Sequence, residues 1–198
     1  MAELVRLSIT HYHHFVTSFT DYILDLSMIS VVRAKENDFR LLAEIGRRTF
    51  LASHGHSASI EIINRYLENK FNDDACQEEL KDLKNIYHII YYKQIPAGYS
   101  KIIFDAPDEN IDVKNVTKLE RLYLLQEFYS LKLGWELLKF NIELSKTQDQ
   151  VGMWLFVWKE NHKAVHFYSK AGFAVIGSYD FKLTENHSNP NHQMLLRY

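Results

Sequence analysis

The sequence predicts a mixed α/β fold, with helices on both faces of a central, mostly antiparallel twisted sheet of about seven strands. Two observations predict it. Short β-rich runs joined by a tight connection come early in the chain, and strand–helix–strand units follow them, which is the order of a mixed sheet. Proline and glycine are scarce, at 3 and 7 of 198 residues, so long flexible linkers are not expected. One compact unit with a substantial core is therefore expected.

Residues 1–27 are expected to be an N-terminal extension, and residues 28–198 a single domain. Aromatic and aliphatic residues recur in the extension at steps of three and four, which predicts an amphipathic helix. The histidines between His11 and His14 fit either a metal site or a polar helix face, and we favour the polar face.

The first half of the domain is expected to hold one strand and three helices. A β-branched run forms the strand, and Asn37 or Asp38 can cap the first helix. A small-residue segment then breaks the chain before the second helix, and an acidic surface helix follows. In order, the expected ranges are 29–33 (strand), 39–48 (helix), 49–59 (break), 60–71 (helix) and 72–84 (acidic helix).

The second half is expected to alternate strands with helices. Two β-rich runs are joined by a hairpin-like connection, and a proline-containing loop separates them from the next strand. Gly172 suits the C-terminal cap of the last helix. The expected ranges are 85–92 and 97–104 (strands), 105–116 (loop), 119–125 (strand), 134–146 (helix), 151–158 (strand), 161–171 (helix), 173–183 (strand), 184–191 (polar loop) and 193–198 (strand).

Composition excludes several classes of protein. The net charge of −2 gives no basic field for nucleic acid. No apolar run approaches the ~20 residues that span a bilayer, so no membrane partner is expected. Cys76 is the only cysteine, so an intrachain disulfide and a zinc–thiolate cluster are both excluded, and no metal site is predicted. Together these features predict a cytoplasmic protein.

The segment from Lys118 to Phe140 reads as a strand, a polar turn and the start of a helix. Unpaired N–H groups at such a helix start bind anions, phosphate included. The segment resembles the acetyl-CoA-binding part of the Gcn5-related N-acetyltransferases, in which a Gln/Arg-x-x-Gly-x-Gly/Ala loop wraps the pyrophosphate. Tyr129 stands where Gln or Arg is usual, Lys132 replaces the first glycine, and Gly134 fits the pattern.

A second motif lies directly after the strand over 151–158 and strengthens this resemblance. The family pattern Asn-x-x-Ala-x-x-Phe-Tyr-x-Lys-x-Gly-Phe is matched in register by Asn161, Ala164, Phe167, Tyr168, Lys170, Gly172 and Phe173. The resemblance covers roughly residues 28–198. Within the family, the chain looks most like the bacterial spermidine/spermine (polyamine) N-acetyltransferases.

The resemblance implies the family fold and a site for acetyl-CoA, whose pantetheine arm lies where two parallel strands splay apart. The backbone N–H of Leu125 is then expected to polarise the thioester carbonyl. Asn161 would bond the pantetheine, and for Lys170 two readings stay open, a contact with the CoA phosphates and a solvated surface position. The remaining cofactor-binding residues are expected to be Tyr123 on the strand and, in the pyrophosphate loop, Tyr129, Ser130, Leu131, Lys132, Leu133, Gly134 and Trp135.

The same resemblance implies the catalytic groups. Tyr168 matches the acid that protonates the departing thiolate, because a phenol keeps its proton at neutral pH. Glu120 matches a carboxylate base for the amine, and His54 and His56 are alternative proton acceptors.

Two functions stay open at this point. The first is acetyl transfer from acetyl-CoA to a small primary amine, with polyamines first, by direct attack in a ternary complex. The second is a degenerate module that binds acyl-CoA without turnover, which the altered phosphate loop would favour. The sequence leaves the oligomeric state open as well, with a homodimer among the alternatives.

Overall fold

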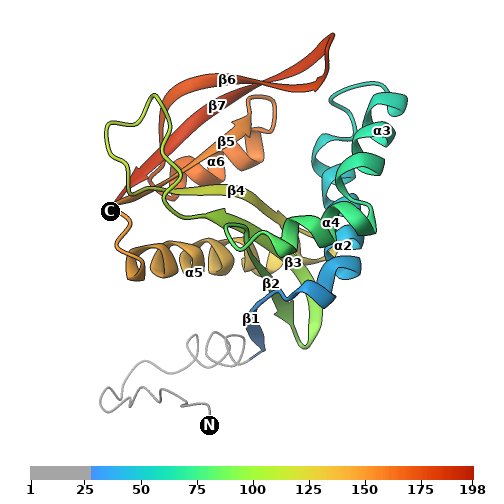
Figure 1. Cartoon of the computed structure of the whole chain (residues 1–198), viewed down its shortest axis with the longest axis horizontal. Coiled ribbons are helices and arrows are strands. Elements are labelled where there is room, and N and C mark those ends of the chain that lie inside the picture. The colour runs from blue at the N-terminus through green and yellow to red at the C-terminus, as the bar shows by residue number, and fades with distance from the viewer. Residues whose placement is uncertain (1–27) are drawn as a thin grey trace.

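A computed structural model describes residues 28–198, which form one seven-stranded mixed sheet in the order β1-β2-β3-β4-β5-β7-β6 (Figure 1). The parallel pair β4–β5 lies in the middle, and all other neighbours are antiparallel. The predicted fold class is thereby confirmed. The predicted helix in residues 1–27 and the His11–His14 cluster lie outside the described residues.

The first half of the chain supplies one edge strand and three helices. Their bounds are β1 (Ile29–Arg33), the 3₁₀ turn η1 (Glu36–Asp38), α2 (Phe39–His54), α3 (Ile60–Lys70) and α4 (Asp73–Lys81). The side chain of Asn72 caps α4 by accepting the Ala75 N–H at 2.7 Å. The hairpin of β2 (Ile86–Tyr92) and β3 (Ile95–Ile103) follows. Lys93 and Gln94 both have positive φ, as a two-residue hairpin turn requires.

The second half supplies the remaining four strands. They are β4 (Thr117–Leu124), β5 (Gly152–Trp158), β6 (Ala174–Thr184) and β7 (His187–Arg197). The 3₁₀ turn η2 (Gln126–Leu131) and α5 (Leu133–Thr147) follow β4, and α6 (His162–Lys170) follows β5. Helices α5 and α6 pack on one face of the sheet, with Leu138 and Tyr168 in its largest core cluster, whereas α2 and α4 cover the other face near Tyr87 and Tyr99.

Two boundary predictions were wrong. The break predicted over 49–59 begins later, because α2 continues to His54 through the buried Thr49 and Phe50. The loop predicted over 184–191 is mostly the first half of strand β7, where the buried residues, Asn189 and Asn191, are polar and so give no hydrophobic alternation. Pro190 pairs with Asp180 of β6, and its carbonyl accepts the Lys159 N–H at 2.9 Å just beyond the end of β5. Pro190 is tolerated there because β5 ends at Trp158, opposite Asn191, so the β5–β7 ladder does not need the missing N–H.

Strands β4 and β5 diverge after a short contact. They pair at only two positions, Thr117 with Met153 and Lys118 with Trp154, although β4 runs on to Leu124 and β5 to Trp158. The rest of both strands therefore borders an opening in the middle of the sheet.

Strand β4 also carries a bulge. Lys101 of β3 pairs with Arg121 and Ile102 pairs with Leu119, so Glu120 is an extra residue between the two pairs. A bulge turns two consecutive side chains toward one face. Glu120 and Arg121 consequently both lie on the face covered by α2 and α4.

Candidate active site

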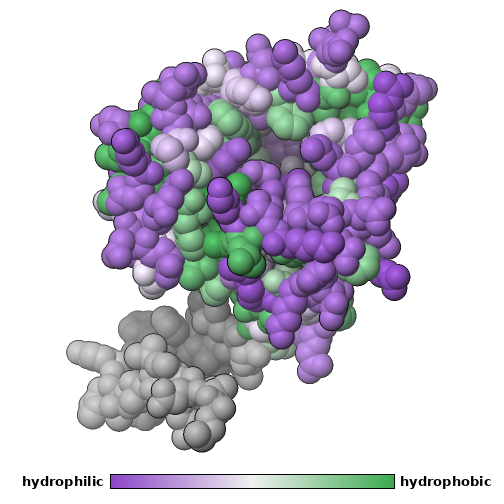
Figure 2. Space-filling view, viewed as in Figure 1, coloured by the Kyte–Doolittle hydropathy of each residue, from purple (hydrophilic) through white to green (hydrophobic). Residues whose placement is uncertain are grey.

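A cleft of about 1400 Å³ opens where β4 and β5 diverge. Figure 2 shows a hollow in this face of the molecule, with hydrophilic residues around much of its rim. Its walls come from α2, α3, α4, β4, η2, α5, β5, α6 and the β6–β7 hairpin. The cleft has two halves that differ in chemistry. We call the part around the starts of α5 and α6 the loop half, and the part around the β4 bulge at Glu120 and Arg121 the ion-pair half.

The loop half is lined by Tyr129, Lys132, Gly134, Trp135, Asn161 and Lys170, all of which the sequence singled out. Trp135 packs edge-on against Phe167 of α6, with ring centroids 6.2 Å apart, and so joins the two helix starts. Lys132, Lys163 and Lys170 line this half together with Gly134 and Trp135 of the α5 start. Cations beside a helix N-terminus suit a phosphate group.

Lys132 adopts the left-handed conformation, with φ +56°, between η2 and α5. Glycine adopts this conformation without steric cost, whereas a residue with a Cβ does not. The backbone geometry thus explains why the motif pattern has a glycine where this chain has Lys132. A side chain at Gly134 would meet Leu124 at 3.4 Å, which is ordinary contact.

Four of the predicted loop and strand residues do not point their side chains into the cleft: Leu125, Ser130, Leu131 and Leu133. Leu125 and Leu133 are buried in the core, and Ser130 is exposed. The predicted role of Leu125 needs correction, because its N–H donates to the Ala97 carbonyl at 2.9 Å. Alternate residues of a strand present their N–H groups to opposite sides. The amides of β4 that face the opening are therefore those of Leu122 and Leu124.

Helix α6 brings Asn161 and Tyr168 to the opening. The Oδ1 of Asn161 caps the helix by accepting the Ala164 N–H at 3.1 Å, and its Nδ2 remains a donor for a ligand. Tyr168 is buried between Phe167 and Phe173 and lines the cleft. Burial, and then the nearby Tyr123, raise the pKa of Tyr168 well above its usual value. Its hydroxyl therefore holds its proton throughout the neutral range.

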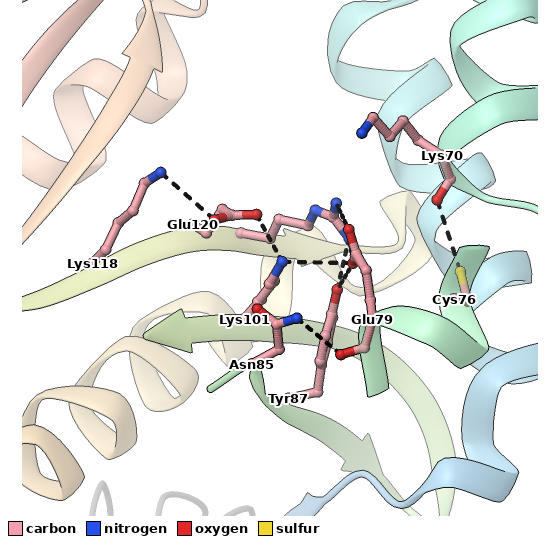
Figure 3. A network of polar contacts seen from close by, with 9 residues as sticks. Lys70, Cys76, Glu79, Asn85, Tyr87, Lys101, Lys118 and Glu120 are labelled. Carbon is pink, nitrogen blue, oxygen red and sulfur yellow. Dashed lines mark hydrogen bonds and ion pairs between the residues drawn. The ribbon is translucent and has the colours of Figure 1, made fainter. Parts of the chain in front are cut away.

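The ion-pair half is built on the bulge. Arg121 forms a bidentate pair with Glu79 of α4 at 2.8 and 3.0 Å, and the Tyr87 hydroxyl donates to the same carboxylate. The Lys101 ammonium, buried beneath, lies 2.9 Å from Glu120 and 3.6 Å from Glu79. Figure 3 shows these groups converging from α4, β2, β3 and β4. The bulge in β4 places Glu120 and Arg121 so that both reach this network.

Both carboxylates of the network stay ionised at neutral pH. Burial pushes the pKa of Glu120 upward, but Lys101 and then Lys118 outweigh it, so the net shift is downward. For Glu79, Arg121 and Lys101 outweigh burial in the same way. A carboxylate with a lowered pKa is a weak base, so Glu120 is better placed to order a water than to take a proton directly.

His54 lies at the meeting point of the two halves. Its ring stacks on Phe50 at 4.8 Å and on Trp158 at 5.6 Å and meets Tyr123 edge-on, while Ser53 bonds its Nδ1 at 2.7 Å. Burial, and then His56, lower the pKa of His54 to about 4. Its imidazole is therefore neutral at pH 7.

Sequence reasoning missed most of the ion-pair half. Helix α4 was predicted to be a charged surface helix, but Glu79 turns inward toward Arg121. Lys101 looked like an ordinary strand residue, yet its side chain is only 5 % exposed. No local pattern marks these residues, because the network joins positions up to 42 apart in the chain. Cys76 is buried, and burial raises the pKa of its thiol to about 11, so this thiol is a poor nucleophile for a covalent relay.

Within residues 28–198, no three histidine, cysteine or acidic side chains cluster so as to hold a metal ion. Over the same residues, every helix is too short or too polar to cross a membrane.

Comparisons with known proteins agree with this geometry. The model of the acetyltransferase (GNAT) family matches residues 49–173. The chain is 28 % identical over 159 residues to an uncharacterised N-acetyltransferase in the pepI 3′ region of Lactobacillus delbrueckii subsp. lactis, which covers 80 % of this chain and 91 % of that one. It is 24 % identical over 148 residues to an uncharacterised N-acetyltransferase of Mycobacterium tuberculosis, with 75 % and 90 % covered.

Solved structures share the fold at lower identity. The PaiA N-acetyltransferase from Thermoplasma acidophilum, in complex with coenzyme A, is 21 % identical, with a TM-score of 0.68 over 86 % of this chain and 99 % of that one. The ribosomal-protein-S18-alanine N-acetyltransferase from Escherichia coli is 13 % identical, with a TM-score of 0.62 over 86 % and 94 %.

Proposed function

The chain belongs to the acetyltransferase (GNAT) family and is an N-acetyltransferase that uses acetyl-CoA, and from this premise we propose that it acetylates the primary amine of a small acceptor by direct attack in a ternary complex. The observation that carries the proposal is the opening between β4 and β5, bordered by Asn161 and Tyr168. An extended pantetheine arm fits such an opening, because it can bond strand amides as an added strand would.

The residues support a division of roles. The loop half, with Lys132 and the α5 start, would hold the pyrophosphate, and the Nδ2 of Asn161 would bond the pantetheine. The thioester carbonyl would accept a hydrogen bond from a β4 amide facing the opening, at Leu122 or Leu124. Donors aimed at the developing oxyanion stabilise the transition state of acyl transfer.

In the proposed reaction, the neutral amine nitrogen attacks the carbonyl carbon and forms the new C–N bond. The C–S bond of the tetrahedral intermediate then breaks, and the Tyr168 hydroxyl protonates the departing thiolate. The amine loses one proton, which a water held by Glu120 accepts. That proton returns through water to the Tyr168 phenolate, so the products are the acetylated amine and CoA, and no acetylated side chain forms.

Polyamines are the acceptors that the sequence resemblance implies. A polyamine is held best by carboxylates that have no other partner. Both carboxylates of the network, Glu79 and Glu120, are already paired with cations. The network therefore leaves no unpaired carboxylate to bind the ammonium groups of a polyamine.

The test is an amine panel in an assay of thiol release from acetyl-CoA, with binding of acetyl-CoA measured separately by calorimetry. CoA release that depends on an amine, with the acetylated amine identified by mass spectrometry, supports the proposal. Binding without release for every amine would support the alternative, a module that binds acyl-CoA without turnover.

A further inference from the structure

The cleft carries more positive than negative charge. Six cationic side chains line it (Lys70, Lys118, Arg121, Lys132, Lys163 and Lys170) against three carboxylates (Glu79, Glu120 and Glu160). Three of the cations belong to the loop half, where phosphates are expected. The excess in the ion-pair half therefore needs a separate explanation.

In the ion-pair half, both carboxylates are already neutralised. Glu79 is paired with Arg121 and Lys101, and Glu120 with Lys101 and Lys118. Three cations thus face two carboxylates before Lys70 is counted. Glu160 lies beside the start of α6 and is exposed, so it does not belong to this network.

Lys118 and Lys70 are the two cations of this half that can reach a ligand. The Lys118 ammonium lies 3.6 Å from the Glu120 carboxylate, but that carboxylate is also paired with Lys101, at 2.9 Å. The Lys118 ammonium also lies over the Trp154 ring, 5.2 Å from the centroid, which holds it above the open sheet face. Within residues 28–198 no carboxylate pairs with Lys70. Figure 3 shows the Lys118 side chain beside Glu120 and the Lys70 side chain on the other side of the network, extending above Glu79 toward the space between them.

The other walls of this half are aromatic. Phe156 stacks on Tyr179 at 4.5 Å, and Tyr66 of α3 meets Phe181 of β6 at 6.1 Å. The second contact, together with a 2.8 Å bond from His187 to the Ser57 carbonyl, joins α3 to the β6–β7 hairpin across the end of the cleft. A bridged end favours a small acceptor over an extended polypeptide.

One buried polar atom lacks a partner in the same walls. The Oδ1 of Asn191 has no hydrogen bond among residues 28–198, although the residue is 8 % exposed and lines the cleft. An unsatisfied buried acceptor is costly, and rotation of the Asn191 side chain toward the cleft would let a ligand N–H remove the cost. Asn191 pairs with Trp158 at the end of β5, beside the opening.

We propose that the acceptor is a small primary amine that also carries an anionic group, a carboxylate or a phosphate. Lys118 and Lys70 bind the anionic group, and the Oδ1 of Asn191 accepts a hydrogen bond from the amine. This inference rests on the proposed acetyl transfer and names the class of its acceptor.

The test measures binding of matched probes to the protein saturated with CoA, by calorimetry. One pair is 2-aminoethyl phosphate against ethanolamine, a second is L-phenylalanine against phenethylamine, and spermidine is the polycationic probe. In at least one pair, the anionic member is expected to bind about tenfold tighter or more. The pair that shows the preference tells phosphate from carboxylate.

Two variants assign the preference to residues. Lys118→Gln is expected to reduce the preference for the anionic probe about tenfold, while the affinity for the matched neutral amine changes by less than about twofold. Lys70→Gln is expected to reduce the preference as well. Lys118→Arg should keep the preference. Lys84→Gln, a lysine substitution between α4 and β2 outside the cleft, serves as the control and should change nothing.

Several results would overturn the inference: equal binding within both pairs, tightest binding of spermidine, no binding of any probe, or equal losses for both members in Lys118→Gln. Thiol release decides the proposed function separately. If CoA is released but the anionic and neutral probes bind equally, only the inference about the acceptor class fails. If the anionic probes bind more tightly but no amine causes CoA release, the proposed acetyl transfer fails and the anion-binding site remains.

Discussion

The two halves of the cleft are built in different ways. The loop half comes from two short stretches of chain, Tyr129–Trp135 and Asn161–Lys170, and relies on helix starts and backbone amides. The ion-pair half is made of side chains from α2, α3, α4, β2, β3, β4 and the β6–β7 hairpin. A shared cosubstrate needs a shared backbone frame, whereas an acceptor site can vary through side chains on a constant scaffold.

The largest expected effect lies at the boundary between the halves. Tyr168→Phe removes the proton donor and is expected to lower kcat about a hundredfold or more. Acetyl-CoA affinity should stay within about twofold, because the ring remains in its aromatic contacts. Stopped assays of CoA release and calorimetry measure the two quantities. Tyr91→Phe, on β2, is the matched control, and an unchanged kcat in Tyr168→Phe would remove this residue from the mechanism.

The next effect tests whether the ion-pair half depends on its network. Arg121→Met leaves Glu79 with Lys101 and Tyr87 only, and is expected to cost about 3 kcal/mol of unfolding free energy in urea titrations. Glu79→Gln combined with Arg121→Met should recover part of this loss. Lys146→Met breaks an exposed pair with Glu143 and should cost less than about 1 kcal/mol. Equal losses in the two single variants would mean that the network is an ordinary surface feature.

The next prediction concerns His54, which lies between the two halves, and the way its lowered pKa makes the unfolding free energy depend on pH. Its folded pKa of about 4 lies below the unfolded value of 6.5. Below pH 6.5 the unfolded chain therefore takes up a proton that the folded protein refuses. Stability is fully present above pH 6.5 and is lost as the pH falls toward 4, by up to about 1.4 kcal/mol per pH unit.

The comparison is His54→Gln, followed by urea unfolding between pH 7 and pH 4.5. The variant should show the shallower loss. His88 is buried and has its pKa lowered to about 4 in the same way, first by burial and then by Arg33, but it is present in both proteins and cancels. Parallel curves for the two proteins would show that His54 titrates normally in the folded state.

The smallest effect concerns the loop half. Lys132→Gly relieves the positive φ and is expected to raise the unfolding free energy by roughly 0.5–1 kcal/mol. Acetyl-CoA affinity reports on the side chain itself. A loss of about tenfold or more would mean that the ammonium contacts phosphate, whereas equal or better binding would mean that it is merely tolerated there. A destabilised variant would contradict the conformational account.

The contrast between the halves also explains what the sequence could predict. Gly134, Asn161 and Tyr168 stand at fixed spacings within single strand–helix units, so local pattern was enough to bring them to one cleft. The fate of the Leu125 amide was not visible, because it depends on whether β3 continues alongside, and Ala97 does so. The pairing of Glu79 with Arg121 depends on a bulge in β4, which no composition or periodicity marks.

The most direct test of the central claim is a crystal structure with CoA bound. The account predicts the pantetheine arm between β4 and β5, bonded to the amides of Leu122 or Leu124 and to Asn161, with its sulfur within about 3.5 Å of the Tyr168 hydroxyl or one water away. Coenzyme bound elsewhere, or strands β4 and β5 paired along their whole length with the opening filled by side chains, would contradict it.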